Sequence, residues 1–251
     1  MEKVIKSGKI RKRSKGMPIR ELPYDMILLD ESYLDEIMEL QATIVKGLSR
    51  ADMLEAFPRD FMKRHLGSQG IALGILVEGD LVAFRCVYFP ERDDREWNLG
   101  IDIGLPDAEL DRVANLQMVC VHPAYRGNSL AYRMNMPAIR AVRDLKRYCH
   151  LCATVSPYNY WNIRILLRSG FAVRKLKDKY GGKLRYVVHQ DLRRPPRAPF
   201  REEAVVRLTD IERQREMLAQ GFNGVKIREI RGFRARERQD LAHGYELVFA
   251  R

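Results

Sequence analysis

Apolar and polar residues alternate with two different periods along the chain, and these periods predict its strands and helices. Residues 17–29 form an apolar run typical of a strand, and residues 59–66 are predicted to form a short helix. Residues 71–77 and 81–89 are apolar runs on either side of Glu78-Gly79-Asp80, a pattern typical of a β-hairpin. Between the first strand and the short helix, six apolar residues recur at helical spacing: Leu34, Ile37, Met38, Leu40, Ile44 and Leu48.

The middle of the chain changes character at residue 114. Residues 90–113 are polar and acidic and are predicted to form a loop. The elements predicted after it are a strand over 116–121, a helix over 127–147, a strand over 151–155, a helix over 161–168 and hairpin strands over 173–177 and 184–189. Pro137 falls inside the long helix and is expected to kink it. This order of elements predicts a mixed α+β domain over residues 17–191, rather than a regular βα alternation.

The two ends of the chain follow other patterns. Residues 1–16 have no apolar periodicity and are predicted to be a flexible basic tail. Residues 192–202 are rich in proline and arginine, which is typical of a linker. Residues 203–251 contain three short strand patterns and one helix pattern, and they predict a small C-terminal α/β subdomain. Because about 50 residues bury little core alone, we expect this subdomain to dock on the main domain or on a second copy, as a homodimer.

Charge is distributed unevenly over the 251 residues, whose formal net charge is +12. Residues 21–111 hold 8 basic and 20 acidic side chains, whereas residues 112–191 hold 15 basic and 3 acidic ones. One interpretation is a basic half that holds an anionic ligand and an acidic half that meets a cation. The alternative is an ordinary solvated surface.

Hydropathy and cysteine content indicate the compartment. No apolar stretch approaches the roughly 20 residues of a membrane-spanning helix, and no apolar run follows the basic N-terminus, so neither a membrane span nor a secretory signal is predicted. Four cysteines stand mostly within apolar segments, which is typical of buried thiols in a reducing cytoplasm. Cys149 and Cys152 match C-x-x-C but have no second cysteine pair, so no metal site is predicted.

The segment from Leu116 to Ala131 carries the clearest chemical signal. An apolar strand ends at Val121-His122-Pro123, and Arg126-Gly127-Asn128-Ser129 then opens a helix. The start of a helix presents unpaired backbone N–H groups and the positive end of the helix dipole, which together favour phosphate. Gly127 allows close approach of a ligand to the backbone. An ordinary strand-to-helix turn with a serine cap remains the alternative.

This segment resembles motif A of the GNAT superfamily of N-acetyltransferases, in which Gln/Arg-x-x-Gly-x-Gly/Ala follows a strand ending in Val-x-Pro. Arg126-Gly127-Asn128-Ser129-Leu130-Ala131 departs from that pattern once, at Ser129, where the family usually has glycine. A second segment resembles motif B: Asn159, Gly170 and Phe171 fit the family spacing. Leu166 stands where many relatives have the tyrosine that protonates the departing CoA thiolate.

The resemblance covers residues 17–191 and implies a GNAT fold, acetyl-CoA or another acyl-CoA as co-substrate, and direct attack by a primary amine in a ternary complex. It implies that residues 118–121 splay from residues 151–155 and that pantetheine enters the gap between the two strands. The residues implied to bind the acyl-CoA are Val119, Cys120, Val121, Arg126, Gly127, Asn128, Ser129, Leu130, Ala131 and Asn159. Tyr158 and Tyr160 are the candidates to replace the missing tyrosine as the thiolate acid.

The general base and the acceptor stay open at this stage. The strand before motif A has no carboxylate, so Glu96, Asp102 or a water molecule are the candidate bases. The acceptor is expected to be a small-molecule or peptide amine. The basic flanks also suit an acidic partner, either an acyl carrier protein that delivers a longer acyl chain or RNA. A module that senses acyl-CoA without catalysis is the third hypothesis.

Overall fold

The protein is described from a computed structural model, which covers residues 3–13, 16–194, 203–233 and 242–251. The chain divides into two compact units, and neither is continuous in sequence. Unit 1 comprises residues 1–48, 56–90 and 114–145, and unit 2 comprises residues 49–55, 91–113 and 146–251. No helix in the described ranges is long and apolar enough to cross a membrane.

Unit 1 is built on antiparallel strands joined in chain order. They are β1 (Val4–Lys12), β2 (Arg20–Leu29), β3 (Gly70–Val77), β4 (Asp80–Tyr88) and β5 (Val113–Val121). The hairpin predicted around residues 78–80 is confirmed, with Val77 opposite Asp80. Glu78 and Gly79 both have positive φ, at 54° and 91°, which is the backbone of a two-residue type I′ turn.

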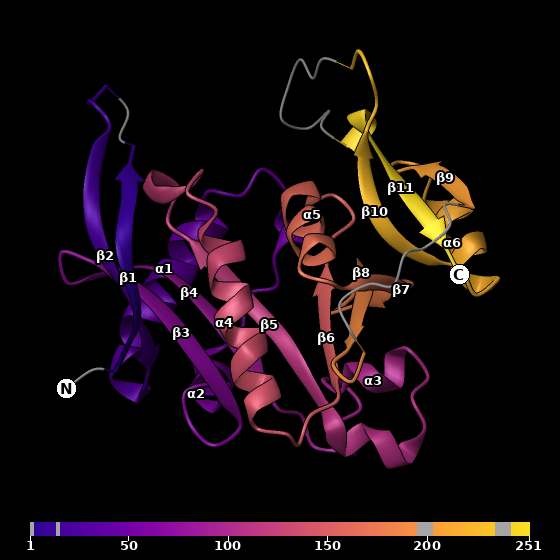
Figure 1. Cartoon of the computed structure of the whole chain (residues 1–251), viewed down its shortest axis with the longest axis horizontal. Helices are drawn as coiled ribbons and strands as arrows, with labels where there is room; N and C mark the ends of the chain where they lie inside the picture. Colours follow the sequence, from indigo (N-terminus) through magenta and orange to yellow (C-terminus); the bar gives the residue numbers. More distant parts are fainter. Residues whose placement is uncertain (1–2, 14–15, 195–202, 234–241) are drawn as a thin grey trace. The chain divides into compact units, whose positions relative to one another are not determined.

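Helices cover both faces of this sheet (Figure 1). Helix α4 (Leu130–Asp144) lies across one face, and α1 (Leu34–Lys46) and α2 (Arg59–Arg64) lie across the other. The predicted apolar face of α1 is confirmed, because Leu34, Ile37 and Ile44 are buried. Pro137 lies inside α4 as predicted, and the helix continues beyond it for two turns.

Strand β1 corrects the predicted flexible tail over residues 1–16. Residues 4–12 pair with β2 from Val4 opposite Ile27 to Lys12 opposite Arg20. Only Ile10 on this strand is fully buried, at 1% exposure, and it packs in the same core cluster as Tyr24 and Met134. Residues 4–12 show no apolar alternation because β1 is an edge strand, which is held by backbone hydrogen bonds and a single buried side chain.

Unit 2 is a second set of antiparallel strands in the order β6-β8-β7-β10-β11-β9. The strands before residue 192 are β6 (His150–Val155), β7 (Ala172–Lys179) and β8 (Lys183–Asp191). Helix α5 (Tyr160–Arg168) contacts β7 and β10, as does α6 (Ile211–Ala219). The predicted hairpin around residues 180–183 is confirmed, with Lys179 opposite Lys183.

Residues 203–251 form the predicted three strands and one helix: β9 (Ala204–Arg207), α6, β10 (Asn223–Glu229) and β11 (Tyr245–Ala250). They are part of unit 2 rather than a separate unit. Gly224 of β10 pairs with Val173 of β7, and the ring of Tyr245 stacks on Tyr160 at 3.6 Å. The predicted linker over 192–202 lies mostly outside the described residues.

The segment 90–113 is not the loop that its polarity predicts. It contains α3 (Leu99–Asp102) and a 3₁₀ segment, Asp107–Arg112. Buried Asn98 caps α3 by accepting a hydrogen bond from Gly100 N at 3.1 Å, and its amide donates to Leu110 O at 3.0 Å. Leu99 packs against Val187 and Cys152. One asparagine and one leucine thus organise a segment whose average composition is polar.

Candidate acyl-CoA site

The strand-to-helix connection of unit 1 has the backbone that the sequence predicts for an anion site. After β5 the chain makes a 3₁₀ turn, Pro123–Tyr125, which His122 caps by accepting from Ala124 N at 3.2 Å. Gly127 then takes φ +85° and Ser129 takes φ +57°. A serine in this left-handed conformation is strained, because its Cβ crowds the backbone. The fold nevertheless keeps Ser129 in this conformation.

The first turn of α4 leaves its backbone donors unpaired. Ser129 occupies the N-cap position but its side chain makes no capping hydrogen bond. Within the described parts of the chain, the N–H groups of residues 127–131 have no acceptor. Unpaired N–H groups at the start of a helix are normally satisfied by a cap, water or a ligand. The turn therefore fits an anion, and the absence of a Cβ on Gly127 keeps the backbone accessible.

Asn128 performs a structural role that the sequence did not predict. Its side chain accepts from Arg11 N at 2.9 Å and donates to Arg11 O at 2.7 Å. It also donates to Tyr125 O at 2.8 Å. A further bond joins Arg13 N to Ala124 O at 2.7 Å. The side chain of Asn128 therefore faces β1, and only its backbone N–H remains for a ligand.

The other predicted cofactor residues of unit 1 lie on β5 or at the start of α4. Val119 and Val121 are half-buried and pair with Arg85 and Ala83 of β4, and Cys120 is buried. Leu130 is buried in the core cluster that also holds Tyr125, so its backbone rather than its side chain is available. Arg126 is exposed at the end of the 3₁₀ turn. The structure thus places residues 126–131 at one turn, which follows the end of β5, residues 119–121, after the 3₁₀ segment Pro123–Tyr125.

The segment that resembles motif B forms α5 and the turn on either side of it in unit 2. Asn159 is the N-cap and accepts from Asn162 N at 3.2 Å. Tyr160 is buried, stacks on Tyr245 and accepts a hydrogen bond from Arg164 at 3.1 Å. Tyr158 is half-buried, and the guanidinium of Arg50 lies 3.8 Å from its ring centroid. Of the two predicted acid candidates, Tyr158 is the one whose ring is not enclosed in the core.

Two of the predicted base candidates lie in unit 2, and one of them is already engaged. The Asp102 carboxylate, 6% exposed, contacts Lys177 Nζ at 2.6 Å and Lys179 Nζ at 2.5 Å. Each carboxylate oxygen of Asp102 is already paired with a lysine, so the structure argues against Asp102 as the base. Glu96 is exposed. On β5 the buried side chains include Asn115 and Met118, and the strand carries no carboxylate.

A polar group that sequence reasoning missed lies on β6 and the β7–β8 hairpin. Thr154 Oγ1 and the Tyr180 hydroxyl are 3.1 Å apart, and Trp97 stacks on the Tyr180 ring at 5.6 Å. Burial raises the pKa of Tyr180 to about 12. Arg185 is 2% exposed, and one of its terminal nitrogens has no hydrogen-bond partner among the described residues. Alternation along β8 puts Arg185 on the same face as Lys183, His189 and Asp191, so the sequence pattern does not predict its burial.

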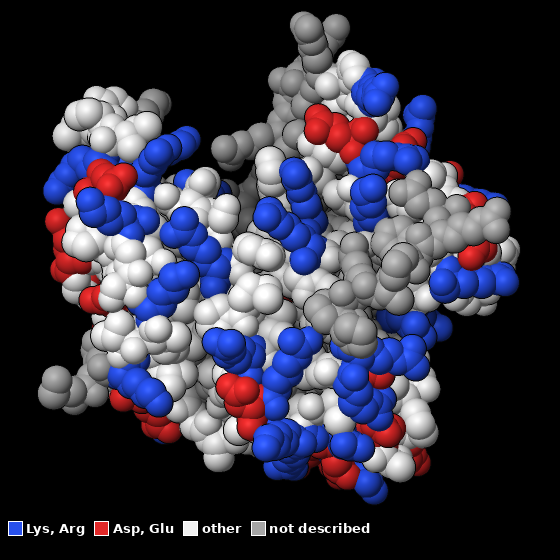
Figure 2. All heavy atoms as spheres, viewed as in Figure 1, with Lys and Arg blue, Asp and Glu red and all other residues white. Residues whose placement is uncertain are grey.

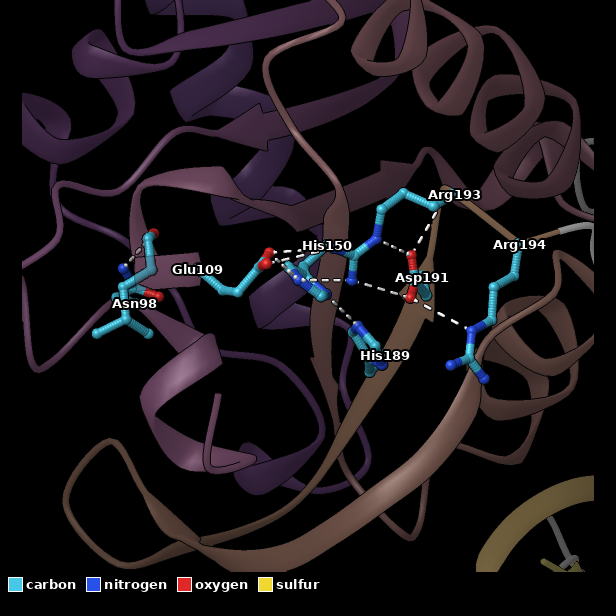
Figure 3. A network of polar contacts seen from close by, with 8 residues as sticks. Asn98, Glu109, His150, His189, Asp191, Arg193 and Arg194 are labelled. Atoms are coloured by element: carbon cyan, nitrogen blue, oxygen red, sulfur yellow. Dashed lines mark hydrogen bonds and ion pairs between the residues drawn. The ribbon is translucent and has the colours of Figure 1, made fainter. Parts of the chain in front are cut away.

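A second polar network, shown in Figure 3, ties the end of β8 to the segment before β5. His150 lies between His189, at 3.0 Å, and the carboxylate of Glu109, at 2.9 Å. Arg193 contacts Glu109 at 3.3 Å and Asp191 at 3.0 Å. These contacts join β6 and the end of β8 to the 3₁₀ segment Asp107–Arg112.

The four cysteines are free and buried, which confirms the prediction of core thiols for Cys120 and Cys152. Burial raises the pKa of Cys86 to about 12 and raises the pKa of Cys120 and Cys152 further. A thiol that stays protonated is a poor nucleophile and a poor metal ligand. Among the described residues no group of three or more His, Cys, Asp or Glu side chains converges as a metal site.

Comparison with solved structures identifies the fold. An N-acetyltransferase from Staphylococcus aureus superposes with a TM-score of 0.52 at 12% identity, over 68% of this chain and 99% of that one. The ribosomal-protein-S18-alanine N-acetyltransferase from Escherichia coli gives 0.50 at 13% identity, over 71% and 99%. A protein from Salmonella typhimurium, described as an acetyltransferase and solved with acetyl-CoA, gives 0.51 at 16% identity, over 70% and 97%.

The chain therefore has the α+β fold of the GNAT acetyltransferases, as its motifs predict. No protein-family model matches the sequence, and no curated protein matches it. At identities of 12–16% the likeness is one of fold.

Proposed function

We propose that this protein is an N-acyltransferase that binds acetyl-CoA, or another acyl-CoA, at the turn between β5 and α4 and transfers the acyl group to a primary amine. The observation that carries the proposal is the row of unpaired N–H groups at residues 127–131. It occurs at the place where the sequence resembles motif A, on a fold shared with acetyltransferases.

The turn suits the pyrophosphate of acyl-CoA. Backbone donors surround a phosphate without adding mobile side chains, and the helix dipole favours its charge. Gly127 presents no Cβ toward the ligand, and Arg126 adds a cation at the rim. The polar edges of β5, at Val119 and Val121, are proposed to pair with the pantetheine amides like an added strand.

Acyl-CoA supplies a thioester, whose carbonyl an amine attacks directly. The chain contributes mainly position, because holding donor and acceptor in register removes most of the entropic barrier. A strand N–H is proposed to stabilise the developing oxyanion. For the thiolate we favour Tyr158, because Arg50 fixes the orientation of its ring whereas the Tyr160 hydroxyl already accepts from Arg164. Water is the favoured route for the proton of the amine, since Asp102 is held by two lysines.

A binding measurement with a matched control tests the proposal. Titration calorimetry with acetyl-CoA is expected to give saturable binding that Gly127→Glu weakens about 100-fold, because a carboxylate enters the anion site. Gly221→Glu is the control: Gly221 has φ +86°, against +85° for Gly127, and has open space around its Cβ position. Equal weakening by both variants would point to backbone strain instead. Failure of the wild type to bind any acyl-CoA would refute the proposal.

Turnover assays separate the remaining candidates. Binding of acetyl-CoA with no transfer to any primary amine in a broad panel would favour a sensing module, for which the buried Leu166 at the usual tyrosine position is the supporting observation. A preference for long acyl chains, or for acyl carrier protein as donor, would favour an N-acyltransferase that takes its acyl group from acyl carrier protein.

A further inference from the structure

A cavity of about 310 Å³ adjoins the proposed pyrophosphate turn, and its opposite wall is the N-terminal strand β1. Gly127, Asn128, Ser129 and Arg133 line it from the turn and the first residues of α4. The other wall is lined by three basic side chains on β1 and directly after it: Lys9, Arg11 and Arg13. Glu21 of β2 completes this wall. Figure 2 shows Lys and Arg side chains gathered over this part of unit 1.

Most of the charge around the cavity is uncompensated. Lys9 pairs with Glu21 at 3.4 Å. In the described part of the chain, no carboxylate lies within ion-pair distance of Arg11, Arg13 or Arg133. Three guanidinium groups without a counter-charge repel one another, and that cost is recovered when an anion binds between them.

The position of these cations is fixed by the backbone. The two hydrogen bonds between Asn128 and Arg11, and the bond from Arg13 N to Ala124 O, attach the end of β1 to the turn. The Arg13 guanidinium consequently lies 3.8 Å from the position that a Cβ on Gly127 would occupy. Arg13 therefore reaches the ligand side of the turn, although it follows a strand that lies more than a hundred residues earlier in the sequence.

The chemistry of the ligand decides what such a cavity would hold. If the proposed function is right, the backbone donors of residues 127–131 take the pyrophosphate of CoA. CoA carries a further phosphate, a monoester at the ribose 3′ position, with a charge of about −1.5 to −2 at pH 7. A dianionic monoester matches three unpaired guanidinium groups, because arginine binds phosphate through paired N–H donors.

We propose that β1 builds a 3′-phosphate subsite, in which Arg11, Arg13 and Arg133 bind the phosphomonoester of CoA. This inference rests on the proposed acyl-CoA function. It makes the N-terminal strand a specificity element, which distinguishes CoA from 3′-dephospho-CoA. The same cations contribute little to the pyrophosphate itself, which the backbone donors hold.

The test compares dissociation constants for CoA and 3′-dephospho-CoA by titration calorimetry on the full chain. The wild type is expected to bind CoA at least roughly tenfold more tightly, the gain of one charge-assisted phosphate contact. Arg11→Gln with Arg13→Gln is expected to bring the ratio close to one, while affinity for 3′-dephospho-CoA changes by less than about twofold. Lys6→Gln, on β1 but away from the cavity, is the control and is expected to keep the ratio.

The outcomes distinguish failure of the 3′-phosphate subsite from failure of the acyl-CoA function. Equal affinity of the wild type for the two ligands overturns the 3′-phosphate subsite and leaves the acyl-CoA function standing. Equal loss of both ligands in the double arginine variant also overturns it, because the arginines would then serve the pyrophosphate. Failure of the wild type to bind either ligand refutes the acyl-CoA function itself. Melting curves of each variant verify that the fold is retained.

Discussion

The side chain of Asn128 binds both backbone groups of Arg11, at 2.9 and 2.7 Å, although 117 residues separate the two in sequence. An asparagine side chain carries the same donor and acceptor as a peptide group, so it extends the pairing of β1 by one position. The residue that resembles part of a ligand-binding motif thus also anchors the N-terminal strand.

Replacing Asn128 tests this anchor. Asn128→Ala removes three hydrogen bonds from a half-buried site and is expected to lower the free energy of unfolding by about 1–2 kcal/mol. Urea unfolding followed by circular dichroism measures the change. Asn162→Ala, at the α5 N-terminus, serves as a comparison because its amide lies in unit 2. An unchanged urea midpoint in Asn128→Ala would show that β1 is held without the asparagine.

The burial of β1 gives a second prediction. Ile10 is 1% exposed, whereas Ile5 on the same strand is 40% exposed. Ile10→Ala is expected to lower the free energy of unfolding by about 2–4 kcal/mol through lost burial and a cavity. Ile5→Ala is expected to change it by less than about 0.5 kcal/mol. Equal, small effects of both substitutions would mean that residues 3–12 are not part of the folded core.

Tyr158 and Tyr160 differ in ways that kinetics can resolve. If Tyr158 protonates the leaving thiolate, Tyr158→Phe is expected to lower kcat by about 100-fold with little change in KM. Tyr160→Phe removes a partner of Arg164 and is expected to cost about 1 kcal/mol of stability, with kcat changed less than about threefold. A normal kcat in Tyr158→Phe would move the acid role to another group.

The pairing of Asp102 predicts a stability effect rather than a catalytic one. Asp102→Asn leaves Lys179, whose side chain is 8% exposed, without its carboxylate and is expected to lower stability by about 3 kcal/mol. Asp178→Asn, an exposed aspartate nearby in sequence, is the control and is expected to be neutral. A loss of activity in Asp102→Asn without loss of stability would restore Asp102 as a base candidate.

One buried histidine, His65, and one half-buried histidine, His189, predict a loss of stability in mild acid. Burial lowers the pKa of His65 and of His189 to about 4, from 6.5 in the unfolded chain. The unfolded state therefore binds protons first, so stability is complete above pH 6.5 and falls as the pH drops toward 4. At pH 5 each histidine is expected to cost about 2 kcal/mol relative to pH 7.

Urea midpoints at pH 7 and pH 5 measure this loss. His65→Leu is expected to reduce the difference between the two pH values by about half, and the exposed His243→Gln is expected to leave it unchanged. The range from pH 7 to pH 5 lies above the pH at which Glu109 and Asp191 begin to take up protons. A hydrogen bond with His150 lowers the pKa of Glu109, and one with Arg193 lowers the pKa of Asp191. A difference that His65→Leu does not alter would assign the acid sensitivity elsewhere.

The hydrophobic patterns predicted the central elements well, because α1, α4 and α5 each bury one regular face and β3 and β4 are continuous apolar runs that are buried on both faces. They failed where single side chains organise the backbone. Ile10 is the single buried side chain of β1, and Asn98 with Leu99 orders a segment of polar composition. Local pattern carries little information about such positions, because their partners lie far away in sequence.

The same difference between local patterns and long-range contacts applies to the candidate site. Residues 126–131 were predicted, since a turn before a helix is a local feature with a known pattern. The position of Arg11 and Arg13 beside this turn was not predicted, because it depends on the pairing of β1 with β2 and on the side chain of Asn128. The role of Asn159 as a helix cap, and the enclosure of Tyr160 by Tyr245, likewise depend on contacts within unit 2.

The interleaving of the two units has a consequence for synthesis of the protein. Unit 1 needs residues 114–145 to complete its sheet and α4, and unit 2 needs residues 49–55 and 91–113 in addition to residues 146–251. A nascent chain therefore holds an incomplete unit 1 until about residue 145 has left the ribosome, and unit 2 closes only when β11 emerges. A domain built from one continuous segment can fold as soon as that segment has been synthesised. Here the open edge of the unfinished sheet is exposed throughout elongation, and slowing translation is expected to lengthen the period during which aggregation competes with folding.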